Sequence, residues 1–155
     1  MPFDNSLILI DGTKTYTAAT AASFVAATST TRESTNTGAA VIDLQGTGVY
    51  GLAAVLIIPV LASATDYLTM LLEGSEEADF GESAYYNKTL VVFNQAGVTD
   101  GRILASECTA GLVVVQRFST DLRYVRVNGT PTAVGSTGTF GALQVLLSPY
   151  PFLDL

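Results

Sequence analysis

The residue types that could carry chemistry in this chain are acids, one thiol and a few arginines, and histidine is absent. Without histidine the chain can form no Ser-His-Asp or Cys-His pair, and it lacks a common ligand of zinc and iron. It contains neither a phosphate-binding glycine loop nor a dinucleotide fingerprint. Asp66, Glu107 and Asp121 lie close to strand ends, but nothing in the sequence fixes the carboxylate separation that glycoside hydrolysis needs. We therefore predict no enzymatic activity and no cofactor.

The densest group of acids lies between residues 73 and 82. Carboxylate oxygens could hold Ca²⁺, but this stretch lacks the Asp-x-Asp-x-Asp-Gly spacing of a calcium loop. We favour a solvated, turn-rich excursion whose charges keep a sheet edge from pairing with other molecules. The five acids are Glu73, Glu76, Glu77, Asp79 and Glu82.

The single cysteine and two of the arginines are further candidate functional residues. Cys108 is the only cysteine, so no intrachain disulfide can form. Its apolar neighbourhood predicts a buried, inert thiol and assembly in a reducing compartment. Arg123 and Arg126 fall on opposite faces of a strand by parity, and surface salt bridges are the favoured interpretation. The alternative is that one of them reaches across an oligomer contact, where arginine is enriched.

Composition limits the partners that this chain can have. It has 155 residues, 48% of them hydrophobic and 14% charged, with a net charge of −7. Binding to nucleic acid is disfavoured because phosphate contacts need clustered Lys and Arg. The apolar run 49–64 is too short for a membrane helix and is interrupted by Pro59. A surface with so few charges suits a protein that is buried against partner proteins.

The elements that must position these residues are short strands separated by turn signals. Their spacing predicts a single-domain, all-β, antiparallel β-sandwich of about eight strands, jelly-roll-like, with extended N- and C-terminal arms. Residues 121–149 read as its closing hairpin, and the apolar run 52–60 reads as a strand buried on both faces. The predicted strands are 39–44, 52–60, 65–73, 84–94, 103–107, 110–118, 122–128 and 140–147.

The two ends of the chain differ from this strand pattern. We assign residues 1–37 to an N-terminal arm with a polar, low-complexity segment, and residues 38–155 to the sandwich domain with its C-terminal tail. The apolar ends suit arms that lie in a neighbour's groove, and the alternative is that they pack on their own domain. The candidate interface residues are Pro2, Phe3, Leu7, Arg123, Arg126, Tyr150, Phe152 and Leu153.

Several segments, taken in order, resemble a known family. The resemblance lies in the start Met-Pro-Phe-Asp-Asn-Ser-Leu-Ile-Leu, in the segments 41–45 and 68–80, and in the stretch 122–127 with its threonine- and glycine-rich continuation. In order and spacing they are similar to the small capsid cement, or decoration, proteins of tailed bacteriophages. The resemblance covers most of the chain from Val41 onward, together with the N-terminal segment.

The resemblance implies a jelly-roll sandwich that forms homodimers or homotrimers on the outer surface of a capsid. There it would staple neighbouring copies of the major capsid protein, with no catalysis and no cofactor. The implied location is the virion, after assembly in the host cytoplasm. A second interpretation is a carbohydrate- or cell-surface-binding module of a tail or fibre, for which exposed tyrosines such as Tyr85, Tyr86 and Tyr150 would form the platform.

Overall fold

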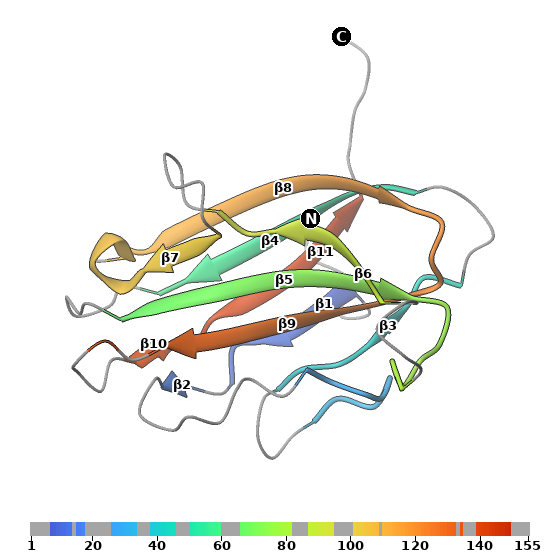
Figure 1. Cartoon of the computed structure of the whole chain (residues 1–155), viewed down its shortest axis with the longest axis horizontal. Coiled ribbons are helices and arrows are strands. Elements are labelled where there is room, and N and C mark those ends of the chain that lie inside the picture. The colour runs from blue at the N-terminus through green and yellow to red at the C-terminus, as the bar shows by residue number, and fades with distance from the viewer. Residues whose placement is uncertain are drawn as a thin grey trace, which may run out of the picture.

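A computed structural model of the chain describes residues 7–13, 15–17, 26–33, 38–45, 50–59, 66–81, 87–94, 101–108, 110–132, 134 and 139–149. Strands dominate these segments, and a short 3₁₀ turn, η2 (Ala105–Cys108), follows one of them (Figure 1). None of the described segments contains a helix long and apolar enough to cross a membrane. The strands are β1 (Ile8–Asp11), β2 (Tyr16–Thr17), β3 (Ile42–Asp43), β4 (Tyr50–Ile58), β5 (Tyr67–Ser75), β6 (Lys88–Val92), β7 (Arg102–Leu104), β8 (Leu112–Thr120), β9 (Tyr124–Thr132), β10 (Thr139–Gly141) and β11 (Gln144–Pro149).

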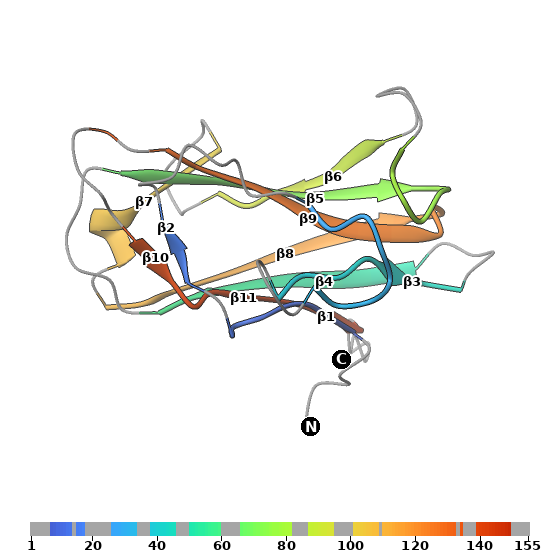
Figure 2. The same cartoon turned by 90° about the horizontal axis from the view of Figure 1, so that it is seen from below.

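The strands form two antiparallel sheets packed face to face. One sheet has the order β1-β11-β4-β8, and the other has the order β3-β9-β5-β6, with β7 also pairing with β5. Seen edge-on, β5, β6 and β9 lie in one layer and β1, β4, β8 and β11 in the other (Figure 2). The short pair β2 and β10 lies at one end of the sandwich. The predicted all-β sandwich is confirmed.

The strand order is that of a jelly roll. Each sheet interleaves strands from the early and late parts of the chain, and the chain crosses to the other sheet between most successive strands. The β5–β6 hairpin is the exception, because these consecutive strands pair with each other. Two interlocked Greek keys with eight main strands define the jelly-roll architecture. The topology therefore agrees with the predicted jelly-roll-like fold.

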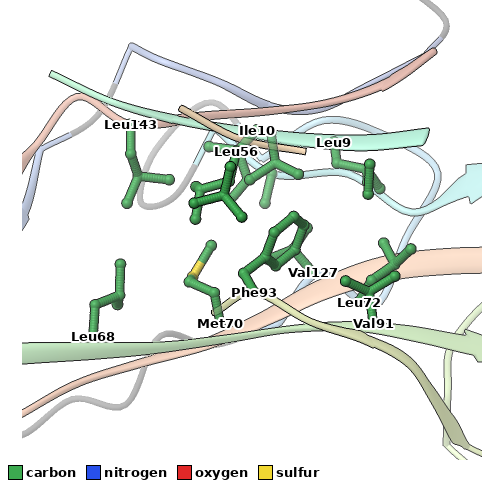
Figure 3. Packing of buried hydrophobic residues seen from close by; sticks show 14 of the residues in the cluster. Leu9, Ile10, Leu56, Leu68, Met70, Leu72, Val91, Phe93, Val127 and Leu143 are labelled. Atoms are coloured by element: carbon green, nitrogen blue, oxygen red, sulfur yellow. The ribbon is translucent and has the colours of Figure 1, made fainter. Parts of the chain in front are cut away.

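Alternation along the strands explains how the core forms. In β5, Leu68, Met70 and Leu72 are fully buried, whereas the residues between them are only partly buried. Such a period of two places every second side chain on the same face of a sheet. Figure 3 shows side chains from both layers meeting in the middle, with Phe93 packed among them. Burial of these apolar side chains is the main force that holds the two sheets together.

The predicted closing hairpin at residues 121–149 is wrong. Its two strands, β9 and β11, lie in different sheets: β9 pairs with β3 and β5, and β11 pairs with β1 and β4. Each strand was recognisable from its own residues, but its hydrogen-bonding partners come from distant parts of the chain. The connection between β9 and β11 therefore crosses from one layer to the other.

The assignment of all residues before 38 to an arm is also wrong for part of that segment. Residues 8–11 form β1, which pairs with β11, and both Leu9 and Ile10 are fully buried. The segment 26–33 packs alongside residues 38–41 through backbone hydrogen bonds such as Val41 N to Ser29 O, 2.9 Å. The side chain of Arg32 donates to the carbonyl oxygens of Gly38 and Ile8. These contacts make the two segments part of the sandwich.

Candidate interaction surfaces

Arg126 is committed to contacts within the chain. It lies on the outer face of β9, and its Nε donates to Glu73 Oε2 on the neighbouring strand β5 at 2.9 Å. The guanidinium carbon lies 4.1 Å from the centre of the Phe80 ring, and NH1 reaches the carbonyl of Ala27 at 3.4 Å. Asn128 donates to the second oxygen of Glu73 at 2.9 Å. With 12% of its side chain exposed, Arg126 offers little surface to a partner.

The acidic stretch forms the end of β5 and a tight turn. The Ser75 hydroxyl oxygen accepts a hydrogen bond from Glu77 N at 3.1 Å, and Asp79 Oδ1 accepts one from Gly81 N at 3.0 Å. Such side-chain to backbone bonds are typical of turns. Within the segments that the structure describes, no group of three or more acids, cysteines or histidines is arranged to hold a metal ion. Glu82 lies outside those segments.

Arg123 forms an exposed, two-pronged ion pair. Its Nε and NH2 donate to the two carboxylate oxygens of Asp43 at 3.0 and 2.8 Å, which joins the start of β9 to β3. The bound guanidinium holds the pKa of the Asp43 carboxyl below its ordinary value. Half of the Arg123 side chain stays exposed, and its guanidinium lies over the Tyr124 ring. The salt bridges predicted for Arg123 and Arg126 are both present, and only Arg123 remains accessible.

A groove opens beside this ion pair, at the end of the sandwich where β1 and β4 begin and β11 ends. Asp43 belongs to its wall, and a turn in which Gln45 N donates to Asp43 Oδ1 at 2.7 Å shapes its rim. Gln45 adopts a left-handed backbone with a φ of 56°. The volume of the groove is about 470 Å³. Its lining is Leu7, Ile42, Asp43, Leu44, Gln45, Gly51, Leu52 and Pro149.

The described parts of the two chain ends meet at this groove. Leu7 is the first described residue and Pro149 is the last, and both line it. Leu7 is partly buried and packs against the hydrophobic core, so it is at least partly a core residue. The other candidate interface residues at the ends, Pro2, Phe3, Tyr150, Phe152 and Leu153, lie outside the described residues.

A second surface is the outward face of the sheet β1-β11-β4-β8. Val113 and Val115 on the edge strand β8 are 62% and 55% exposed. They stand directly opposite Ile57 and Val55 on β4, which are partly buried. Opposed residues of antiparallel strands lie on the same face, so these four side chains form one apolar patch. We call this set the valine patch.

The outward face of the other sheet has a different character. Thr69 and Glu73 on β5 stand opposite Thr130 and Arg126 on β9. That face therefore carries mainly hydroxyl, amide and charged groups, with one apolar pair formed by Leu71 and Val92. The contrast shows that the valine patch is a property of one sheet rather than of the whole surface.

Sequence analysis missed the valine patch, although its signal was present. The apolar run 52–60 was predicted to be buried on both faces, and the structure buries one face in the core while the other forms part of the molecular surface. A strand of consecutive valines, such as Val113-Val114-Val115, necessarily directs one side chain away from the core. Only Val114 of these three is buried.

Cys108 lies in η2 and is fully buried. Its thiol is 3.5 Å from the carbonyl oxygen of Leu104, to which it can donate a hydrogen bond. Burial, and to a lesser extent the nearby Glu107 carboxylate, raise the pKa of the thiol to about 11. A thiol with this pKa is almost entirely protonated at neutral pH and is a poor nucleophile. The predicted burial of this thiol is confirmed, and its inertness stays a prediction.

Fold and surfaces together define a jelly-roll β-sandwich with one apolar sheet face and a groove at the chain ends. Comparison with known proteins extends this no further: no family model, no curated protein and no solved structure matches the chain.

Proposed function

We propose that this protein is a structural component of a bacteriophage head. It binds the outer surface of the capsid and staples neighbouring copies of the major capsid protein. The observation that carries the proposal is the convergence of both chain ends on one apolar groove, between Leu7 and Pro149. The residues that precede Leu7 and follow Pro149 in the sequence include apolar ones, and in this proposal they bind a neighbouring protein together with the groove.

Composition and fold support the same proposal. Only 14% of the residues of the chain are charged, so its surface loses little favourable hydration when it is covered by a protein partner. Jelly rolls are a recurrent architecture of viral capsid proteins, although the same fold also serves lectins and other proteins. The experiment must therefore distinguish attachment to a capsid from attachment to a sugar.

The test is attachment of the purified full chain to heads that lack it, measured by co-sedimentation. Truncation after Pro149 removes Tyr150, Phe152 and Leu153 and should abolish attachment without unfolding the sandwich. A second variant, Gly51→Lys, acts on the groove itself. Gly51 lines the groove, is exposed, and has no atom within 4 Å of the position that a Cβ would take. The lysine should therefore obstruct docking without disturbing the fold.

Ser106→Lys is the matched control, because Ser106 is exposed in η2 and does not line the groove. It should attach like the unmodified chain. The proposal is wrong if the unmodified chain does not co-sediment with heads, or if heads with and without it retain their genome equally well on heating. Clear, competable binding on a glycan array in place of head attachment would establish the sugar-binding interpretation instead.

A further inference from the structure

The valine patch has no counterpart elsewhere on the described surface. Four residues in the described segments are large, apolar and exposed. The two most exposed are Val113 at 62% and Val115 at 55%, followed by Val134 at 49% and Val92 at 38%. Val113 and Val115 are neighbours on one face of an edge strand, whereas Val134 lies in a loop and Val92 on β6 of the other sheet. Edge strands with exposed β-branched residues promote association unless something covers them.

We propose that the outward face of the sheet β1-β11-β4-β8 is covered by the same face of a second copy of this chain, with the valine patch at the centre of a two-fold interface. This inference deepens the proposed function and rests on it for the setting in which many copies meet. It adds the surface through which copies pair, which differs from the groove proposed to contact the capsid.

The outward face of the sheet β1-β11-β4-β8 opposes contact between two copies only weakly, because it carries few charges. Each copy carries a net charge of −7, so two copies repel each other through most of their surface. Among the described residues of the four strands that point outward, the charged ones are Arg117 on β8 and Asp11 on β1, which stands opposite Gln144 at the other edge of the sheet. Arg117 lies four residues from Val113 along β8, so a two-fold axis that runs across the strands near Val113 and Ile57 keeps the two guanidinium groups at opposite rims. Self-pairing through this face therefore places no like charges in contact.

Shape and size are also adequate for pairing. The outward face is a sheet surface, and two such surfaces pack at about 10 Å from each other, as the two sheets of a sandwich do. With a strand spacing of about 4.8 Å and a rise of about 3.3 Å per residue, the part of the four strands that does not line the groove presents a flat area of about 400 Å². Two copies then bury about 800 Å² before side-chain relief is added, which approaches the roughly 1,000 Å² of a specific interface.

The groove and the valine patch lie at opposite ends of the same sheet. Gly51 at the start of β4 lines the groove, and Ile57, six residues later, belongs to the patch. Six residues of a strand extend about 20 Å. A dimer centred on the patch therefore leaves both grooves accessible, and each dimer presents two of them. One pair of copies can then contact two capsid subunits at once, which is what stapling requires.

The test is the oligomeric state of the purified full chain, without capsids, by sedimentation velocity from low to high micromolar concentration. The unmodified chain should form dimers. The double variant Val113→Lys/Val115→Lys should raise the dissociation constant by about tenfold or more, because lysines buried in an apolar contact lose hydration. Val134→Lys, which introduces one lysine at a similarly exposed valine outside the patch, should leave the dimer intact.

A second measurement covers the case in which the double variant fails to fold. Backbone amide NMR shifts of the unmodified chain should change with concentration in residues 51–57 and 112–119 and not in residues 67–75. A monomer at all concentrations, a dimer that survives the double variant, or shift changes confined to the other sheet would each overturn the inference. A monomeric chain whose head attachment requires Val113 and Val115 would show that the capsid covers this face. Loss of head attachment by a chain that still dimerises would instead contradict only the proposed function.

Discussion

At the scale of single residues, two arginines on neighbouring parts of the chain illustrate how burial changes the worth of an ion pair. Arg126 and Glu73 have side chains that are 12% and 13% exposed, and Arg126 also packs on Phe80. Arg123 pairs with Asp43 in a geometry that is at least as regular, but half of its side chain is in water. Solvent screening makes exposed pairs weak, whereas breaking a largely buried pair leaves an uncompensated charge.

We therefore expect Arg126→Ala to lower the free energy of unfolding by about 3 kcal/mol, within the range for buried pairs that lose one partner. The loss has two physical sources: among the described residues the Glu73 carboxylate keeps Asn128 as its one side-chain donor, and Phe80 loses the guanidinium above its ring. Urea unfolding at pH 7 measures it. Arg123→Ala is the control and should leave the urea midpoint nearly unchanged; equal losses from the two variants would contradict this account.

A second prediction at this scale concerns Cys108. Because burial raises the pKa of its thiol to about 11, the thiol of the folded chain should not react with a thiol reagent such as Ellman's reagent at pH 8. Unfolding in urea returns the pKa to its ordinary range and exposes the sulfur, so one thiol per chain should then react at once. Rapid stoichiometric reaction of the native protein would show that η2 does not bury Cys108.

At the scale of elements, β1 contributes to the core although its residues were predicted to belong to an arm. Its four residues read as the apolar start of an arm, yet they pair with β11 and place Leu9 and Ile10 in the core. We expect Leu9→Ala to destabilise the chain by about 2–4 kcal/mol, as truncation of a fully buried leucine does. Val115→Ala, at an exposed position, should cost far less. Thermal unfolding of both variants at low micromolar concentration, where the proposed dimer contributes little, makes the comparison.

The same contrast shows what could be predicted from the sequence. Each of the eight predicted strands overlaps a strand of the structure, because alternation of apolar residues and turn signals are local features. The pairing of β9 and β11 was wrong, because hydrogen-bonding partners in a jelly roll are distant along the chain. The groove and the valine patch depend on such non-local pairing. Four separate parts of the chain line the groove, and the patch combines residues of β4 and β8. Residue patterns alone could not bring them together.

At the scale of the whole molecule, net charge and apolar surface act against each other. Like charge on two copies that each carry −7 opposes their approach, and the sequence pI of about 4.2 means that this repulsion persists at neutral pH. The valine patch supplies the opposing attraction, which is proportional to the apolar area removed from water. Because salt screens repulsion between exposed charges but leaves apolar burial in place, the two contributions can be separated by ionic strength.

We therefore expect the proposed dimer to become tighter as NaCl rises from 0.05 to 0.5 M, concentrations chosen because the Debye length falls across them from about 14 to about 4 Å. Sedimentation velocity at constant protein concentration measures the change. Val134→Lys lowers the net negative charge of each copy without touching the patch, so it should reduce this salt dependence while preserving the dimer. A dimer that dissociates as salt is added would be held by ion pairs between copies, and a charge-poor apolar face could not then be its interface.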